Sequence, residues 1–305
     1  MERLPRKWIP AAGKLVLSIL LSVGLLWILL REIELETVVA IFATIPLQAV
    51  VVGFVLYVLV NALRALRMRV VFREVRYQRL LGVALVHNFW NNLIPLRIGE
   101  FSFLWLMRKH THTNRSLMAL IVFRFLDFAV IALLFLTGIL LITGEGVSLY
   151  GYGLICLVVS LVPGLMLLLL SRLPDRWAPG PVGKLRQELR QYTPRQLFGA
   201  LGYTVVLWVV SLVLFYVLCE PMDMVVTFVQ LWIPISLVRL SNILPVSGLA
   251  GFGTTEGAWA IGLYAVGVDF ESAVASGLLV HLIRLAYTLV LGGVGGLLLR
   301  TSRNS

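Results

Sequence analysis

The chain has 305 residues, of which 59% are hydrophobic and only 13% are charged. Soluble domains are about 45–50% apolar and about 25% charged, so this composition excludes a water-soluble globular protein and predicts a protein that lies in hydrocarbon. The net charge of +11 does not indicate nucleic-acid binding, because the basic residues fall in short segments between apolar runs, a pattern typical of membrane topology.

Six segments are apolar enough to cross a bilayer, which takes about 20 helical residues. The first follows Arg3, Arg6 and Lys7 in the manner of a signal peptide, but charged residues rather than a small-residue cleavage site come after it, so we expect it to remain as a span. Two further apolar regions, 80–107 and 224–267, are interrupted by proline and glycine. The predicted spans cover residues 11–30, 46–64, 116–142, 150–171, 197–219 and 272–299.

The charges of the connecting segments predict which ends share a side of the membrane. Most of the Lys and Arg residues lie in segments 1–14, 64–79, 108–115 and 171–196 and in the C-terminal tail. The other connections are acidic, for example at Glu145 and Asp269. The excess of basic residues in cytoplasmic loops therefore predicts a cytoplasmic N-terminus and a cytoplasmic C-terminus.

The two interrupted regions cannot each cross the membrane once under this assignment. Region 80–107 has basic segments on both sides, and region 224–267 has acidic segments on both sides. Each region must leave on the side where it entered, so each is predicted to be a re-entrant helical hairpin. We expect the hairpins to break at residues that end or bend a helix, namely Pro95, Gly99, Pro245, Gly248, Gly251 and Gly253.

The hairpins share a motif. Asn92-Leu93-Ile94-Pro95 is followed by Gly99-Glu100, and Asn242-Ile243-Leu244-Pro245 is followed by a glycine-rich stretch and Glu256. A span containing an arginine follows each, and three crossings separate them, so segments 80–142 and 224–299 are predicted to form an inverted repeat, a design typical of transporters. The predicted fold is an all-α polytopic membrane protein, a single transmembrane domain over residues 1–305 with about six transmembrane helices plus two re-entrant broken-helix hairpins.

Several charged residues fall at membrane depth, where each costs about 2.5–3.5 kcal/mol if it faces lipid. We therefore expect most of them to face a protein interior or a wet cavity near the midplane, together with the two hairpin asparagines, whose amides can cap carbonyls freed by the breaks. The predicted substrate-binding residues are Arg97, Arg124, Arg239, Arg284, Glu100, Asp127, Glu256, Asn92 and Asn242.

The partners of these charges stay open at this level. Arg124 and Asp127 are three residues apart on one helix face and can pair with each other. Arg284 has no acid nearby in the sequence, and Glu256, Glu100 or a ligand anion could pair with it. Glu100 and Glu256 each follow a glycine near a helix start, where the free N–H groups stabilise either that acid or a bound phosphate.

Three smaller features predict local structure. Gly292, Gly293, Gly295 and Gly296 form a small-residue face suited to close helix packing. Segment 184–192 predicts a short helix lying on the anionic inner leaflet. Thr193-Pro194-Arg195-Gln196 predicts a capping box at the start of the fifth span.

His110 and His112 lack further ligands, so no metal or other cofactor is predicted, and no catalytic motif predicts an enzyme.

The Asn92-to-Glu100 motif, the Arg124-x-x-Asp127 pair and the Asn242-to-Glu256 motif resemble the lysylphosphatidylglycerol synthase transmembrane family, also called the flippase-like domain family, over roughly residues 14–300. In aminoacyl-phospholipid synthases of this kind a soluble aminoacyl-transferase domain follows. The resemblance implies lipid translocation and does not imply lysyl transfer.

We expect a translocator, either flippase or scramblase, that moves an anionic phospholipid or polyprenyl-type lipid between leaflets of a bacterial or archaeal cytoplasmic membrane without nucleotide hydrolysis of its own. Its expected partners are membrane lipids with anionic headgroups, with a homo-oligomer or a lipid synthase as further options. Three alternatives stay open: a membrane-embedded transferase that uses an intramembrane carboxylate as a base, a secondary transporter of a small anion, and a structural partner of another membrane complex.

Overall fold

A computed structural model describes residues 35–94, 99–143, 180–222, 226–241 and 248–301, together with parts of 20–29 and a few single positions between these ranges. Every regular element within these ranges is a helix. The helices are α2 (Leu35–Thr44), α3 (Leu47–Val71), α4 (Tyr77–Leu93), α5 (Glu100–Met107), α6 (Thr113–Thr143), α8 (Gly180–Arg190), α9 (Pro194–Cys219), α10 (Trp232–Ser241), α11 (Thr254–Tyr264) and α12 (Phe270–Thr301), with short 3₁₀ turns η2 (Glu220–Met222) and η3 (Leu249–Gly251).

In the described part of the chain, α3, α6, α9 and α12 are long and apolar enough to cross a membrane. They match four of the predicted spans. Most of the span predicted at 11–30, and nearly all of the one predicted at 150–171, fall outside the described residues. The protein is therefore an all-helical multi-pass membrane protein. The capping box predicted at the start of α9 is confirmed, because Thr193 Oγ1 accepts from Gln196 N at 3.3 Å and Gln196 Oε1 accepts from Thr193 N at 2.9 Å.

One predicted boundary is wrong. The second span was predicted to end at residue 64, but α3 continues to Val71 and so includes Arg67. Arg64 and Arg67 both have partners on other helices, which allows the helix to continue past them. Arg64 Nη1 donates to Asn88 Oδ1 at 2.6 Å, and Arg67 pairs with Asp127.

Both interrupted regions contain two separate helices, as predicted. The first helix of region 80–107 ends at Leu93, and the next begins at Glu100. In the second region α10 ends at Ser241 and α11 begins at Thr254. The predicted break residues Pro95 and Pro245, like Arg97 and Asn242, lie outside the described residues.

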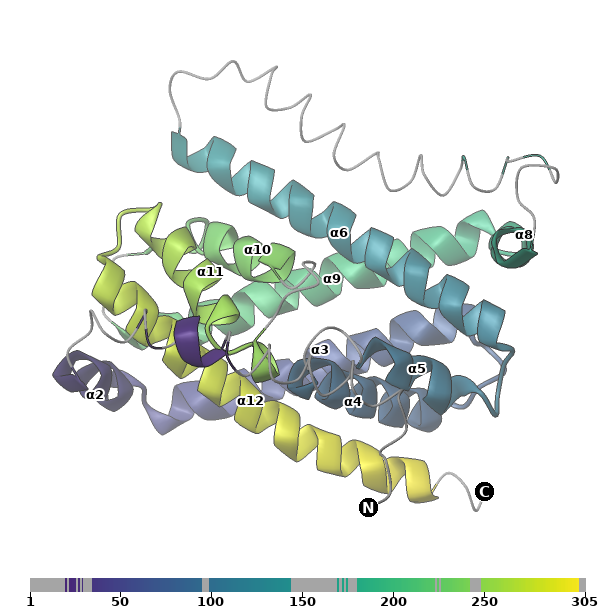
Figure 1. The fold of residues 1–305 in the computed structure, drawn as a ribbon, viewed down its shortest axis with the longest axis horizontal. Coiled ribbons are helices and arrows are strands. Elements are labelled where there is room, and N and C mark those ends of the chain that lie inside the picture. Colours follow the sequence, from purple (N-terminus) through teal and green to yellow (C-terminus); the bar gives the residue numbers. More distant parts are fainter. Residues whose placement is uncertain are drawn as a thin grey trace, which may run out of the picture.

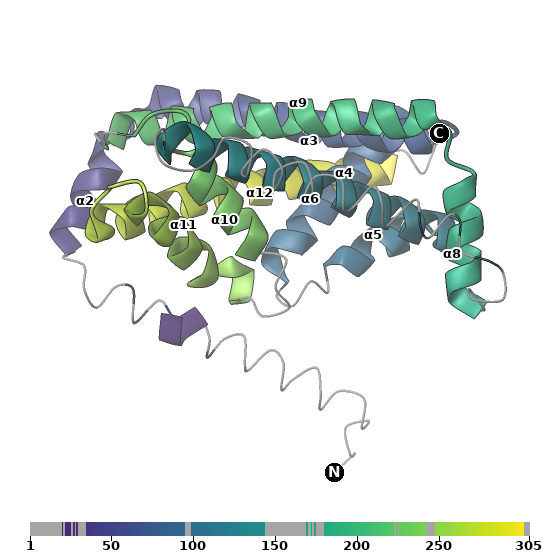
Figure 2. The ribbon, with the colours of Figure 1, turned by 90° about the horizontal axis from the view of Figure 1, so that it is seen from above.

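Long helices from the two halves of the chain pack on each other. Figure 2 shows α3 and α9 side by side along one face, with α3 starting at the end where α2 lies and α9 starting at the opposite end where α8 lies. The helix α4 packs on α12, and α10 packs on α6. Residues from α9, α11 and α12 share the largest hydrophobic cluster, with Trp259 stacked on Phe215 at a centroid distance of 5.5 Å.

The connections rich in Lys and Arg gather at one end of the molecule. Arg115, in the first turn of α6, donates to Glu74 at 2.6 Å in the connection before α4. At the same end Arg79 donates to the carbonyl of Leu299 at 2.9 Å. Figure 1 shows α8 and the end of α12 on this side, and α2 on the opposite side. Segments expected to share one side of the membrane therefore lie together.

The helix predicted over 184–192 exists as α8, but its apolar side packs on α6. Leu189 is buried in a cluster with Met118 and Val122, and Leu185 packs against the same cluster. The apolar residues of α8 therefore contact protein, because α6 offers the helix an apolar surface of its own. That α8 lies on the inner leaflet stays a prediction.

The glycine face of α12 allows α4 to approach closely. A Cβ added at Gly295 would lie 2.6 Å from the Cβ of Leu85, and one at Gly292 would overlap Phe89. Gly293 and Gly296 have nothing within 4 Å of such a Cβ. Close packing, predicted for this face as a whole, is thus made by Gly292 and Gly295.

We expect Gly295→Ala to lower the unfolding temperature in mild detergent, because overpacking costs about 1–3 kcal/mol and exceeds the gain of about 0.5–1 kcal/mol from replacing a helical glycine. Gly296→Ala is the matched control and should leave that temperature unchanged or raise it. Fluorescence-detected size exclusion after heating measures both. Equal effects of the two substitutions would contradict the close α4–α12 contact.

Candidate functional site

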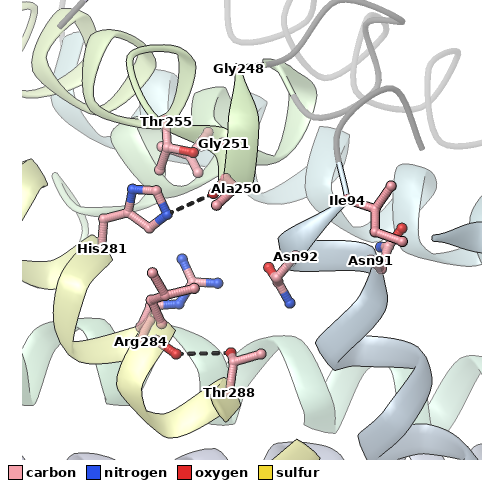
Figure 3. A pocket seen from close by; sticks show the side chains of 12 residues that line it. Asn91, Asn92, Ile94, Gly248, Ala250, Gly251, Thr255, His281, Arg284 and Thr288 are labelled. Atoms are coloured by element: carbon pink, nitrogen blue, oxygen red, sulfur yellow. Dashed lines mark hydrogen bonds between the residues drawn. The ribbon is translucent and has the colours of Figure 1, made fainter. Parts of the chain in front are cut away.

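The two interrupted regions meet at one small polar cavity of about 50 Å³ (Figure 3). A buried water needs roughly 10–15 Å³ of such space, so the cavity has room for about four waters or one compact anionic group. Its lining comes from the end of α4, the segment before α11, and one face of α12. The lining residues are Asn91, Asn92, Ile94, Val238, Gly248, Ala250, Gly251, Thr255, His281, Arg284, Leu285 and Thr288.

Arg284 is the charged group that faces this cavity without a carboxylate partner. It lies on α12, is 8% exposed, and extends its guanidinium into the cavity in Figure 3. Within the described ranges no Asp or Glu lies within ion-pair distance of it, and its buried Nε has no hydrogen-bond partner. The guanidinium lies over the ring of Phe215 at 5.0 Å. A cation–π contact offsets only part of the cost of burying a charge, so the site favours an anion.

Glu256 pairs with His281 instead of Arg284. Its carboxylate is fully buried, accepts from Gly253 N at 2.8 Å, and lies 2.6 Å from His281 Nδ1. His281 Nε2 lies 3.1 Å from the carbonyl of Ala250, and a carbonyl only accepts, so Nε2 carries a hydrogen. The contact between Nδ1 and the carboxylate then requires one shared proton. The pair is neutral overall, so within the described ranges it leaves the charge of Arg284 without an acid to compensate it.

The backbone near Ala250 is held in an unusual conformation to make this contact. Ala250 has φ 52° and ψ 17°, the left-handed region that costs a non-glycine residue about 1–2 kcal/mol. Its carbonyl accepts from the imidazole of His281, and the glycines at 251 and 253 take φ values of 84° and 80° beside it. The strained turn positions backbone atoms at the cavity wall.

A directed chain of hydrogen bonds holds α12 beside α3 and α4. Thr288 Oγ1 donates to the carbonyl of Arg284 at 2.8 Å, so Tyr57 OH must donate to Thr288 across their 2.7 Å contact. Tyr57 OH accepts from Asn88 Nδ2 at 2.7 Å. Asn88 Oδ1 in turn accepts from Arg64 and Asn92, at 2.6 and 3.1 Å. This series of hydrogen bonds fixes the helical turn that carries Arg284.

Asn92 lies at the cavity edge, as predicted for a residue at the end of the first broken helix. Its Nδ2 donates back to the carbonyl of Asn88 at 2.7 Å, so it caps a carbonyl at the end of α4. Figure 3 shows its side chain directed toward the guanidinium of Arg284. Its partner in the predicted motif, Asn242, lies outside the described residues.

The other predicted charges form separate clusters. Arg124 pairs with Glu100, and Asp127 accepts two hydrogen bonds from Arg67, at 2.6 and 3.3 Å, and one from Trp208 Nε1 at 3.2 Å. The pairing of Arg124 with Asp127 within one helix is therefore wrong, because other helices offer each residue a better-placed partner. Glu100, Arg124 and Glu256 do not line the cavity, contrary to the expectation, and Arg284 does.

Arg239 lies on α10 outside the cavity lining. Its guanidinium is over the ring of Trp208 at 5.2 Å, and its buried Nε has no hydrogen-bond partner. Of the predicted break residues, Gly248 and Gly251 line the cavity, and Gly253 precedes the first turn of α11. Gly99 packs against the backbone of Asn91, which brings the start of α5 next to the end of α4.

The sequence matches the family described as the lysylphosphatidylglycerol synthase TM region over residues 15–292, nearly the whole chain. The chain belongs to this family. Membership indicates a membrane protein with a lipid-related role. No individual curated protein matches the chain.

Several residues that organise the site were not predicted from the sequence. Arg64 and Arg67 fall in the predicted connecting segment 64–79, and the predicted site does not include Tyr57, Asn88 or His281. A signal was present for two of them. Asn61, Arg64 and Arg67 recur every three residues, which puts them on one face of a continuous helix.

We expect Asp127→Ala to destabilise the protein strongly, because removing one partner of a buried ion pair leaves a buried charge and costs about 3–5 kcal/mol. The unfolding temperature in detergent measures the effect. Arg115→Ala is the control, since its pair with Glu74 is exposed and worth about 0–1 kcal/mol. Similar losses in the two variants would mean that Asp127 is not a buried anchor for Arg67.

Proposed function

We propose that this protein translocates an anionic phospholipid or polyprenyl-type lipid between membrane leaflets, without nucleotide hydrolysis of its own, and that Arg284 binds the phosphate of the headgroup. One observation carries the proposal. Arg284 extends into a polar cavity between two interrupted helical regions and has no acidic partner among the described residues. A buried cation in a membrane protein marks a substrate pathway by default.

The size and polarity of the cavity favour a headgroup phosphate over a larger ligand. A space of about 50 Å³ holds a phosphate-sized group but no acyl chain. Acyl chains can stay in the surrounding hydrocarbon while the headgroup passes through the protein. Around the phosphate, Thr255 offers a hydroxyl and Arg284 offers forked N–H donors, the geometry that suits a phosphate.

The helix contacts support an inverted repeat larger than the one predicted from 80–142 and 224–299. If α2 to α6 correspond to α8 to α12 in order, contacts occur in matching pairs. The contact of α4 with α12 corresponds to that of α10 with α6, and the contact of α2 with α12 corresponds to that of α8 with α6. The acids correspond too, because Glu100 contacts Arg124 of α6 and Glu256 contacts His281 of α12.

Such a repeat implies about six membrane crossings with two re-entrant hairpins, α4–α5 and α10–α11, that enter from opposite sides. Non-helical backbone at membrane depth is tolerated where it is buried in protein or lines a wet cavity. The polar cavity where the two breaks meet is such an environment. The basic end of the molecule then faces the cytoplasm.

Cysteine labelling in intact cells tests this topology. We expect single cysteines at Glu220 and Asp269 to react with a membrane-impermeant maleimide from outside, and cysteines at Arg73 and Lys184 to react only after permeabilisation. Both positions should be accessible from outside, because a re-entrant α10–α11 hairpin begins and ends on the same side of the membrane. Labelling of the cysteines at 220 and 269 from opposite sides of the membrane would contradict both the predicted hairpin and the predicted inverted repeat.

Transport by the purified protein tests the function. In liposomes that contain fluorescent phosphatidylglycerol, we expect Arg284→Gln to lose protein-dependent movement of the lipid, measured by dithionite bleaching of the outer leaflet. Arg284→Lys should be impaired as well, because an ammonium group cannot contact two phosphate oxygens in the forked geometry of a guanidinium.

Arg73→Gln, which removes an exposed arginine outside the cavity, is the matched control and should move lipid at the wild-type rate. Wild-type transport by Arg284→Gln would contradict the role of this residue. Uptake of radiolabelled phosphate without lipid movement in the same liposomes would contradict the lipid substrate and favour a small-anion transporter.

A further inference from the structure

A second cavity, of about 160 Å³, lies at the basic end of the molecule. It forms where the start of α4, the end of α5 and the end of α12 meet. Arg79, near the start of α4, lies about 20 Å along that helix from Asn92, at a rise of about 1.5 Å per residue, so the two cavities are separate. The lining residues are Arg79, Trp105, Leu106, Arg108, Lys109, Leu299 and Arg300.

The cavity has a buried floor and an exposed cationic rim. Arg79 is buried and donates to the carbonyl of Leu299, which ties α4 to the last turn of α12. Arg108, Lys109 and Arg300 are exposed, and the guanidinium of Arg108 lies over the ring of Trp105 at 5.0 Å. The floor therefore persists when the rim residues change.

The described lining of this cavity is positively charged. Four cationic side chains line it and no Asp or Glu does. Among the described residues, no acid lies within ion-pair distance of Arg108, Lys109 or Arg300. Burial lowers the pKa of His110 in the adjacent connection, and the charges of Arg79 and Lys109 lower it further, as a positive local potential requires.

The cavity also has an apolar side. Trp105 is 57% exposed at the rim, and Leu106 and Leu299 line the wall. Tryptophan beside Lys and Arg is typical of the level of lipid headgroups. Cationic groups that only set topology need no cavity, whereas a concave site with clustered cations and an apolar wall fits an amphipathic anion.

We infer that this cavity binds the phosphate headgroup of an anionic glycerophospholipid in the leaflet that it faces, as a site separate from the cavity at Arg284. Arg108, Lys109 and Arg300 contact the phosphate, and Trp105 and Leu106 contact the glycerol and the upper acyl chains. Binding here does not depend on the proposed transport, so the two proposals fail independently.

Native mass spectrometry of the full chain in mild detergent measures the binding. The probe is dioctanoyl phosphatidylglycerol. It is titrated against a parent without further substitutions, against a cavity variant with Arg108→Ala/Lys109→Ala/Arg300→Ala, and against a variant with Arg73→Ala/Lys184→Ala/Arg195→Ala. The last variant is the matched control, because it removes two arginines and one lysine that are exposed and do not line the cavity. All three are measured with Arg284→Gln in place, which removes the other proposed phosphate site.

We expect the cavity variant to bind the lipid at least about 10-fold more weakly than the parent, since each basic group near a lipid headgroup contributes about a factor of five. The control variant should bind the lipid within about 2-fold of the parent. The single substitution Arg108→Gln, measured in parallel, should show a smaller loss in the same direction. Size exclusion checks that each variant is monodisperse.

Three results would overturn the inference. Equal loss in the cavity and control variants would show general attraction to a basic surface. Equal binding of dioctanoyl phosphatidylcholine would show that the cavity does not select an anion. A third result would assign the site to the free anion. In that case a lipid competitor fails to displace bound lipid at any concentration, and inorganic phosphate binds saturably to the parent but not to the cavity variant.

Discussion

Hydrocarbon offers no hydrogen-bond partner to a polar group. Each charged side chain and each backbone N–H or C=O left unpaired between the apolar helices must therefore find a partner inside the protein. The structure meets this constraint by pairing groups across helices. Arg67 of α3 binds Asp127 of α6, Arg64 of α3 binds Asn88 of α4, and Glu256 of α11 binds His281 of α12. These contacts connect the helices that surround the cavity and hold them in one arrangement.

Arg284 departs from this pattern, and the departure gives the site its chemistry. Glu256, in the first turn of α11, is paired with His281, so it does not neutralise the guanidinium. The chain of hydrogen bonds from Asn88 through Tyr57 and Thr288 ends on the carbonyl of Arg284 and fixes its backbone. A buried cation whose backbone is fixed, and which has no acidic partner in the described part of the chain, is suited to bind an anion. This is the basis of the proposed role in binding a lipid phosphate.

The helix α4 connects the two places where we infer phosphate binding. Its first turn contributes Arg79 to the basic cavity, and its last turn contributes Asn91 and Asn92 to the cavity at Arg284. Along its length, Leu85 and Phe89 lie against the glycine face of α12, which carries Arg284. A lipid headgroup bound at the basic end would therefore lie about 20 Å along this helix pair from the inner cavity.

The sequence by itself determined the membrane class, the four described spans, the interruption of both broken regions, the cap at Thr193 and the family, because each depends on residues near one another in the chain. It also singled out Arg284 and Asn92. It could not determine which charge pairs with which, since local spacing favoured Arg124 with Asp127, and tertiary packing instead gave each a partner from another helix. The partners of Arg64, Arg67 and Glu256 lie 24, 60 and 25 residues away in the chain. Only the packed helices bring them within hydrogen-bond reach, and that packing decides which cation remains free to bind a ligand.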